Sequence, residues 1–126
     1  MPRFRPMPDR PLCNRFHAAV ELIGRRWAGV IINVLMGGRT RYCDIKARIP
    51  EISDRMLSER LRELEAEGVV RRIVTPETPV RVEYELTKKG AALNDALAAI
   101  GDWATAWVEP AGKAKPAAAR ARRRSA

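Results

Sequence analysis

The sequence predicts a mainly helical α+β fold that forms one compact domain. Apolar residues recur at helical spacing along most of the chain, whereas a short stretch after residue 79 alternates apolar and polar residues. The chain has 126 residues, 46% of them hydrophobic, which suffices for one core and is too little for two ordinary domains. We therefore expect a folded domain over residues 12–109, between an arm (residues 1–11) and a tail (residues 110–126).

The two ends differ in composition from the centre. Residues 1–11 contain four prolines, which disfavour a regular helix or a central strand and predict a flexible extended arm. The tail is a low-complexity Ala/Lys/Arg segment without an apolar stripe, which predicts a disordered basic tail. Of the formal charge of +9, the arm carries +2 and residues 111–126 carry +6, so that +1 remains for residues 12–110. A basic surface on the domain must therefore depend on where its charges lie.

Two helices are predicted at the start of the domain. In the first, Phe16, Ala19, Val20 and Ile23 share one face. Asn14 can cap the start of this helix, and Gly24 can end it. The second helix lies in the segment RRWAGVIINVLMGG, and its inward residues are Trp27, Val30, Ile31, Val34 and Leu35.

A short third helix is predicted over residues 41–48, with Thr40 as its cap. Its apolar residues recur every three or four positions, so Tyr42, Ile45 and Ile49 should face inward. A turn must follow, because Pro50 bars continuation of this helix.

A longer helix is predicted over residues 53–67, with Ser53 as its N-cap. Leu57, Leu61 and Leu64 have the i, i+4, i+7 spacing that places side chains on one stripe. This stripe should pack on the core, which leaves the opposite face for a partner. The residues on that opposite face are Arg55, Ser58, Glu59 and Arg62.

After Gly68 the period changes from helical to alternating. The segment VVRRIVT is short and β-branched, and VRVEYELT at residues 80–87 alternates strictly. The intervening PETP has the composition of a turn, so the two segments should form an antiparallel hairpin. The expected face of the second strand consists of Val80, Val82, Tyr84 and Leu86.

The last predicted helix begins after Thr87, its cap, and continues to about Val108. Its apolar residues are spaced 4, 3, 4 and 3, which is typical of a coiled-coil seam. We therefore expect this helix to mediate self-association. The candidate dimerisation residues are Leu93, Leu97, Ile100, Ala104 and Trp107, with Phe16 of the first helix.

This order of elements predicts a winged helix-turn-helix: a helical core, a two-stranded β-hairpin wing and a long C-terminal dimerisation helix. In such folds the second helix of the motif enters the DNA major groove and the hairpin lies over the DNA backbone. Arginines can bind guanine or phosphate, and a serine can bond either kind of base edge. Four basic residues cluster around the short helix at residues 41–48, where they could contact phosphates: Arg39, Arg41, Lys46 and Arg48. The candidate DNA-binding residues are Arg39, Arg41, Lys46, Ser53, Arg55, Ser58, Glu59, Arg62 and Arg81.

Ordinary structural explanations compete with this one. The charged helix face could be a solvated surface with i, i+4 ion pairs, and the hairpin could be an edge ribbon. The terminal helix could pack only within its own subunit.

The chain resembles the HxlR family of bacterial winged helix-turn-helix regulators, within the MarR-like group. The resemblance covers Leu12 to Trp107 and rests on ELIGRRWAGVIINVL, on RYCDIKARIPEISDRMLSERLRELEAEGVVRR and on TPETPVRVEYELTKKG. It implies a dimer built by the first and last helices, recognition by the helix at residues 53–67, and repression or activation of nearby genes. Asn14 replaces a frequent proline, Cys43 replaces a glycine or small polar residue, and the basic tail lies beyond the family pattern.

The two cysteines are candidate redox-sensing residues. Cys13 lies at the expected start of the first helix, where the helix dipole and neighbouring arginines favour a thiolate. Some HxlR relatives sense oxidants or electrophiles through a cysteine near this position. Cys43 lies beside the expected DNA surface, and a bridge to Cys13 of the partner subunit could tilt the reading helices. The alternative is that Cys13 is simply a small buried residue.

Other chemistry is not indicated. His17 has no second ligand at metal spacing, and no nucleophile-and-base pair or phosphate loop is visible. We therefore expect no enzyme activity, no metal and no cofactor. No segment has the apolar length of a membrane span or a signal peptide, which favours the cytoplasm.

The leading hypothesis is a homodimeric transcription regulator, a repressor, that binds a pseudo-palindromic operator in double-stranded DNA. It could respond to oxidants, electrophiles or a small-molecule effector. An architectural nucleoid-type protein that binds DNA with little sequence preference through its basic ends is the main alternative. An RNA-binding protein or a DNA-free interaction module remains a further possibility.

Overall fold

The computed structural model describes residues 10–110, and the side chains of residues 14–110. The predicted arm up to residue 9 and the tail from residue 111 lie outside these described residues. The described chain falls into two units, one ending at Asn94 and the other beginning at Asp95.

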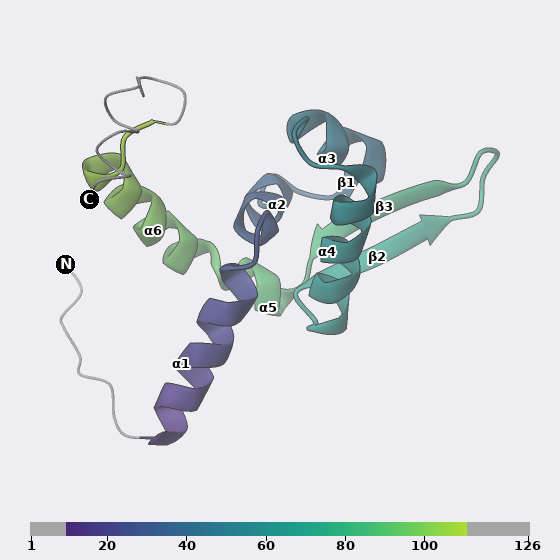
Figure 1. The fold of residues 1–126 in the computed structure, drawn as a ribbon. Coiled ribbons are helices and arrows are strands. Elements are labelled where there is room, and N and C mark those ends of the chain that lie inside the picture. The colour runs from purple at the N-terminus through teal and green to yellow at the C-terminus, as the bar shows by residue number, and fades with distance from the viewer. Residues whose placement is uncertain (1–9, 111–126) are drawn as a thin grey trace. The chain divides into compact units, whose positions relative to one another are not determined.

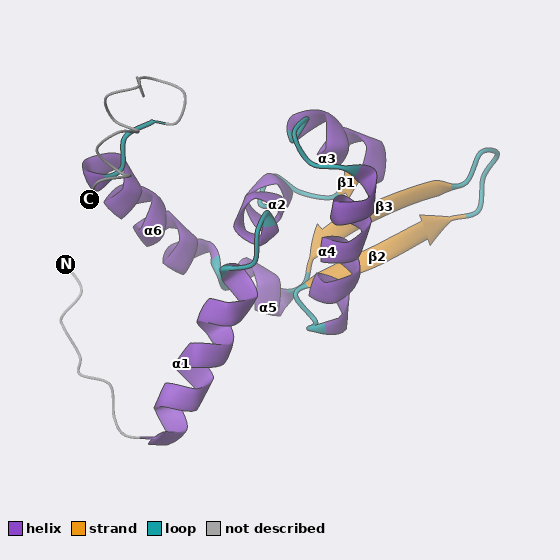
Figure 2. Cartoon of the chain, viewed as in Figure 1, coloured by secondary structure: helices purple, strands orange, loops and turns teal. Residues whose placement is uncertain are grey.

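Figures 1 and 2 show six helices and three short strands over residues 10–110, with one strand between the second and third helices in the chain and the other two between the fourth and fifth. Within the first unit, the loop end of the β2–β3 hairpin extends beyond α3 and α4 (Figure 1). The elements are α1 (Arg10–Ile23), α2 (Ala28–Leu35), β1 (Thr40–Arg41), α3 (Tyr42–Arg48), α4 (Asp54–Ala66), β2 (Val70–Thr75), β3 (Arg81–Leu86), α5 (Lys88–Ala91) and α6 (Asn94–Trp107).

Helix α1 begins earlier than the sequence predicts. Its first residue is Arg10, so Asn14 lies inside the helix and does not cap it. Pro11 is tolerated because the first turn of a helix needs no N–H donor from its residues. The helix ends where predicted, and the N–H of Gly24 donates to the carbonyl of Val20 at 2.7 Å.

Helix α2 is preceded by a residue in an unusual backbone conformation. Trp27 has a φ of 74° and occupies the N-cap without a side-chain hydrogen bond, and its ring lies 5.1 Å from the guanidinium carbon of Arg26. The prediction that Val30 faces inward is wrong, because its side chain is 46% exposed. Ile32 is buried instead, since the stripe of α2 is shifted around the helix relative to the predicted one.

A third short strand precedes α3, and the sequence did not predict it. Thr40 pairs with Tyr84 of β3 rather than capping α3, and its hydroxyl donates to the Gly38 carbonyl at 2.8 Å. The N-cap of α3 is Arg41, without a side-chain hydrogen bond. Thr40 therefore lies one residue before the cap position, and its hydroxyl hydrogen is directed to Gly38, away from the first turn of α3.

The sheet has the order β1-β3-β2, with both pairs antiparallel. The predicted hairpin is confirmed, with Arg72 opposite Tyr84 and Val74 opposite Val82. Tyr84 is 8% exposed, as expected for the inner face. Val80 lines a hollow together with Val82 and Tyr84, but it lies before β3 begins and is 57% exposed.

The core of the first unit combines one face of α4 with residues of α2, α3 and the sheet. Leu57, Leu61 and Leu64 of α4 are at most 1% exposed, as the leucine stripe predicts. Ile45 and Ile49 also face inward as predicted. The remaining buried apolar residues are Ala28, Ile31, Ile32, Leu35, Ile52, Val69, Val70 and Tyr84.

The predicted single terminal helix is two helices. Thr87 caps α5, where its hydroxyl accepts the N–H of Gly90 at 3.1 Å, and it also donates to the Gly68 carbonyl at 2.5 Å. A Cβ at position 90 would lie 2.2 Å from the carbonyl oxygen of Val69, so only glycine allows this approach. The short helix is thereby held to the start of β2, and the chain turns at residues 92–93 before α6 begins.

Candidate nucleic-acid interface

Helix α4 presents a charged face away from the core. Ser53 caps it, and its hydroxyl accepts the N–H of Met56 at 3.0 Å, as predicted. Arg55 and Arg62 are exposed, but Ser58 and Glu59 are only half-exposed. The face opposite the leucines is therefore narrower than the sequence predicts.

Tyr42 connects α3 to α4 at the edge of this face. Its hydroxyl oxygen lies 3.1 Å from the backbone carbonyl oxygen of Asp54 and 3.4 Å from Oδ1 of the same residue. It also lies 3.1 Å from the hydroxyl oxygen of Ser58. The sequence predicts Tyr42 only as an inward residue, because spacing within α3 says nothing about which part of α4 its ring reaches.

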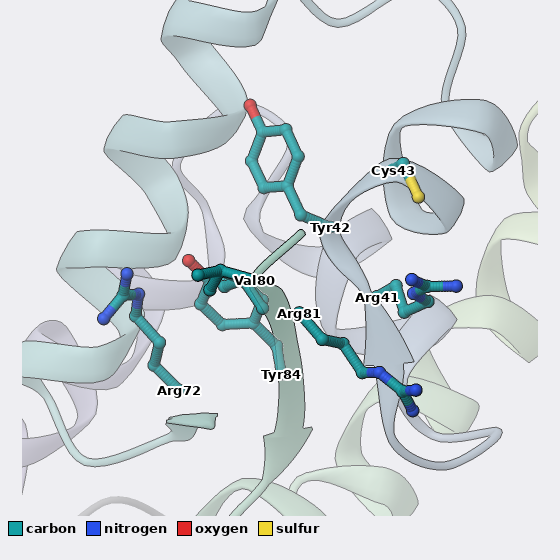
Figure 3. A pocket seen from close by; sticks show the side chains of 8 residues that line it. Arg41, Tyr42, Cys43, Arg72, Val80, Arg81 and Tyr84 are labelled. Atoms are coloured by element: carbon teal, nitrogen blue, oxygen red, sulfur yellow. The ribbon is translucent and has the colours of Figure 1, made fainter. Parts of the chain in front are cut away.

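Two adjoining hollows lie between the helices and the inner face of the sheet. The first, of about 390 Å³, is lined by Ser58, Arg62, Glu65, Arg72 and Tyr84. The second, of about 400 Å³, shares Arg72 and Tyr84 with the first. Figure 3 shows the three arginine side chains of the second hollow pointing outward from its rim, around the ring of Tyr84. The residues that line the second hollow are Arg41, Tyr42, Cys43, Arg72, Val80, Arg81, Val82 and Tyr84.

Arg72 is not among the DNA-binding residues that the sequence predicts, although it lines both hollows. The strand alternation could have indicated it, because Arg72 shares the inner face of β2 with Val70 and Val74. An arginine at an otherwise apolar position of a strand is a signal that the position opens to solvent. Its placement brings a third cation beside Arg41 and Arg62.

Arg39 is not brought together with the α4 residues. Its guanidinium pairs with Glu85 at 3.4 Å and with Glu83 at 3.9 Å, and both carboxylates alternate with Tyr84 along β3. They therefore lie on the outer face of the sheet. Arg71 completes this outer cluster at 3.0 Å from Glu85.

The other basic residues that the sequence predicts near the DNA differ in solvent exposure and in whether an acidic side chain pairs with them. Arg41 and Arg48 are exposed, and Lys46 is half-buried. Arg81 pairs with Glu77 of the hairpin loop at 3.2 Å. A contact of Arg81 with DNA would therefore compete with this ion pair.

The orientation of α4 is also held from its opposite flank. Arg60 donates to the backbone carbonyl of Arg26 at 2.8 Å and to Glu63 at 3.0 Å. Arg25 reaches the same carboxylate oxygen of Glu63 at 3.4 Å. The bonds to Arg26 and Arg25 fasten α4 to the turn between α1 and α2. The Arg60–Glu63 pair within α4 orients both side chains for these bonds.

The predicted dimerisation residues are largely uncovered within their own units. In the first unit, Phe16 is 53% exposed and Leu93 is half-buried. In α6, Ile100 is 50% and Trp107 74% exposed, and Leu97 and Ala104 are half-buried.

Of the two cysteines, Cys43 is an exposed free thiol at the second hollow. Cys13 belongs to the first turn of α1, but its side chain lies outside the described residues. His17 pairs with Glu21 at 3.6 Å. Among residues 10–110, no group of three His, Cys, Asp or Glu side chains could hold a metal ion, and no helix in this part of the chain could cross a membrane.

The fold and the exposed face of α4 are those of a winged helix-turn-helix protein, the class whose second helix binds in the DNA major groove. The HxlR-like helix-turn-helix family matches residues 22–112, and the chain belongs to this family. The HTH-type transcriptional regulator YvaP of Bacillus subtilis is 50% identical over 82% of this chain and 96% of its own length.

Solved structures agree with this assignment. Reduced YodB, a transcriptional regulator of B. subtilis, is 48% identical, with a TM-score of 0.70, and the match covers 78% of this chain and 96% of that one. YodB has also been solved bound to a quinone, with a TM-score of 0.67, 42% identity and coverage of 75% and 99%. The redox regulator HypR in its oxidised form is 31% identical with a TM-score of 0.71, over 76% of this chain and 99% of HypR.

Proposed function

We propose that the protein is a cytoplasmic, homodimeric, sequence-specific repressor that binds a pseudo-palindromic operator. The observation that carries the proposal is the exposed pair Arg55 and Arg62 on α4 beside a rim of further arginines. Helix α4 enters the major groove, where these side chains bind guanine or phosphate. A two-fold dimer presents two such helices to two half-sites.

The residues around α4 have distinct proposed roles. Arg41, Lys46 and Arg72 contact phosphates, which set the register of the protein on DNA without reading its sequence. Arg81 contacts the backbone from the hairpin after leaving Glu77. Arg39 has a smaller role than the sequence suggests, because its guanidinium is engaged by two carboxylates.

Replacing Arg55 and Arg62 together by alanine tests this proposal. We expect at least about tenfold weaker binding to duplexes that the wild-type protein selects from a randomised pool, because one good bidentate contact is worth about 1–3 kcal/mol. The matched control is the double change Arg15→Ala and Arg71→Ala, which removes the same charge away from α4 and should cost less. Equal losses in the two double variants would contradict reading by α4.

We also propose that oxidants or electrophiles regulate DNA binding by reacting with the cysteines. The solved oxidised HypR and quinone-bound YodB support this for two relatives. In this chain, Cys13 is the proposed sensor, and Cys43 beside the arginine rim is the proposed partner from the other subunit. Two thiols would form one disulfide and give two electrons and two protons to an oxidant such as a quinone.

The double variant Cys13→Ser and Cys43→Ser tests this redox proposal. It should bind operator DNA as the wild type does and lose its sensitivity to oxidant, and each single variant shows which thiol responds. Unchanged sensitivity in the double variant rules the switch out. A small-molecule effector is the remaining possibility, and a hollow of about 800 Å³ between α1 and the residues around Val69 and Lys89 is its candidate site.

An architectural role is the second candidate, favoured by the +6 charge of residues 111–126. Deleting these residues distinguishes an architectural protein from a sequence-specific repressor. A repressor keeps most of its discrimination between operator and random DNA, whereas an architectural protein loses most of its affinity for both.

A further inference from the structure

The hydroxyl groups of Tyr42 and Ser58 form a pair whose hydrogens can be assigned from their neighbours. The two oxygens lie 3.1 Å apart, and distance alone does not show which one donates. Tyr42, however, has further contacts with Asp54 at 3.1 Å to the backbone oxygen and 3.4 Å to Oδ1. A carbonyl oxygen and a carboxylate oxygen can only accept.

The single hydrogen of Tyr42 must therefore go to Asp54. If Tyr42 instead donated to Ser58, its lone pairs would face two acceptor oxygens with no hydrogen between them, which is unfavourable at these distances. With the Tyr42 hydrogen committed to Asp54, the contact between the two hydroxyls requires the hydrogen of Ser58. Ser58 thus donates to Tyr42, and the free hydrogen-bonding capacity that its hydroxyl keeps is that of an acceptor, through its two lone pairs.

We propose that Ser58 is a specificity-determining residue that accepts a hydrogen bond from an exocyclic amino group of adenine or cytosine. In the major groove, only adenine N6 and cytosine N4 are donors, whereas guanine O6, thymine O4 and purine N7 accept. A serine held as an acceptor binds the first two and rejects the others. Tyr42 is the positioning residue that imposes this polarity.

The location of Ser58 fits this role, which rests on the proposed reading of DNA by α4. Asp54, Ser58 and Arg62 are spaced four residues apart and so follow one ridge of the helix. Ser58 is half-exposed, and it lines the same hollow as Arg62. A phosphate offers only acceptors, so Ser58 cannot instead act as a backbone clamp while it donates to Tyr42.

The test compares base analogues in duplexes that the wild-type protein selects from a randomised pool. Each adenine or cytosine of the half-site is replaced in turn by purine or 2-pyrimidinone, which lack the amino group. At one position we expect the wild type to bind about 3- to 10-fold more weakly, the worth of one hydrogen bond. Ser58→Ala should bind both duplexes equally at that position and keep its preferences elsewhere.

Tyr42→Phe tests the imposed polarity directly. Without the tyrosine oxygen, the Ser58 hydrogen is free to rotate towards DNA, so Ser58 can donate as well as accept. At the position found above, the variant should tolerate a keto group in place of the amino group within about twofold, whereas the wild type should reject it about tenfold. Tyr84→Phe is the matched control, because it removes a phenol from the same hollow without touching the Ser58 contact.

The outcomes separate this inference from the proposed function. If no position depends on an amino group, or if Tyr42→Phe keeps the wild-type discrimination, the inference is wrong. If the Arg55 and Arg62 double variant still selects the same duplexes, reading by α4 is wrong as well. Thermal unfolding of each variant shows that a changed base preference is not caused by lost folding.

Discussion

Helices α4 and α6 have similar apolar stripes in the sequence and opposite surroundings in the structure. The three leucines of α4 are at most 1% exposed, and none of the residues of α6 is buried. Both patterns have helical period, so the period shows that a stripe exists and does not show what covers it. For α4 the cover is the core of its own unit, and for α6 we propose that it is a second copy of the chain.

The largest expected difference between the helices is the cost of shortening one apolar residue. Leu61→Ala should lower the free energy of unfolding by about 2–5 kcal/mol, because it leaves a cavity in the core. Ile100→Ala should cost much less at concentrations where the chain is monomeric, since its side chain is already 50% exposed. Urea unfolding followed by circular dichroism measures both, and similar costs would contradict the contrast between the helices.

A charge on the α6 stripe should break the dimer without unfolding the first unit. Ile100→Asp should raise the dimer dissociation constant more than about tenfold, the scale of losing a buried interface contact. Analytical ultracentrifugation measures it. The matched control is Ala99→Asp, which adds the same charge beside the stripe and should change association little, so a strong effect there would count against the seam.

The loss of stability on removing a side-chain hydroxyl should also differ between the two helices. Ser53→Ala should cost about 1 kcal/mol, because the N–H of Met56 loses its acceptor at the N-cap. Thr105→Ala in α6 should be close to neutral, since the Thr105 hydroxyl only donates to the Gly101 carbonyl one turn earlier. Denaturation midpoints compare the two, and a larger loss for Thr105 would reverse the expected ranking.

The smallest expected effect concerns the ion pairs that hold the flank of α4. Glu63→Gln should cost about 0.2–1 kcal/mol, since its partners Arg25 and Arg60 are partly exposed. The difference from the wild type should shrink in high salt, because salt screens exposed charges. Unfolding at two salt concentrations checks this, and a loss that salt leaves unchanged would point to packing instead.

Helix α4 shows how much the sequence could predict. The Ser53 cap and the leucine stripe are local patterns, and both are confirmed. The strand alternation likewise predicted the hairpin and the buried Tyr84. These features depend on neighbours within a few residues, which is why a single sequence reveals them.

The features that the sequence missed depend on distant partners. Thr40 has the chemistry of a cap, but β3 lies beside it and pairs with it instead. Arg39 has no acidic neighbour in the sequence, but the pairing of β1 with β3 brings Glu83 and Glu85 next to its guanidinium. The reach of Tyr42 to Ser58 likewise follows from the packing of α3 on α4, which no spacing within either helix contains.

The order of the sheet has a consequence for solubility. Strand β2 lies at an edge, so among the described residues one row of its backbone N–H and C=O groups has no strand beside it. Such an edge is a template for pairing with another chain. Arg71 and Arg72 are exposed on this strand, and two copies that met edge to edge would bring their guanidinium groups together. Charged side chains on an edge strand therefore disfavour edge-to-edge pairing of two copies of the chain.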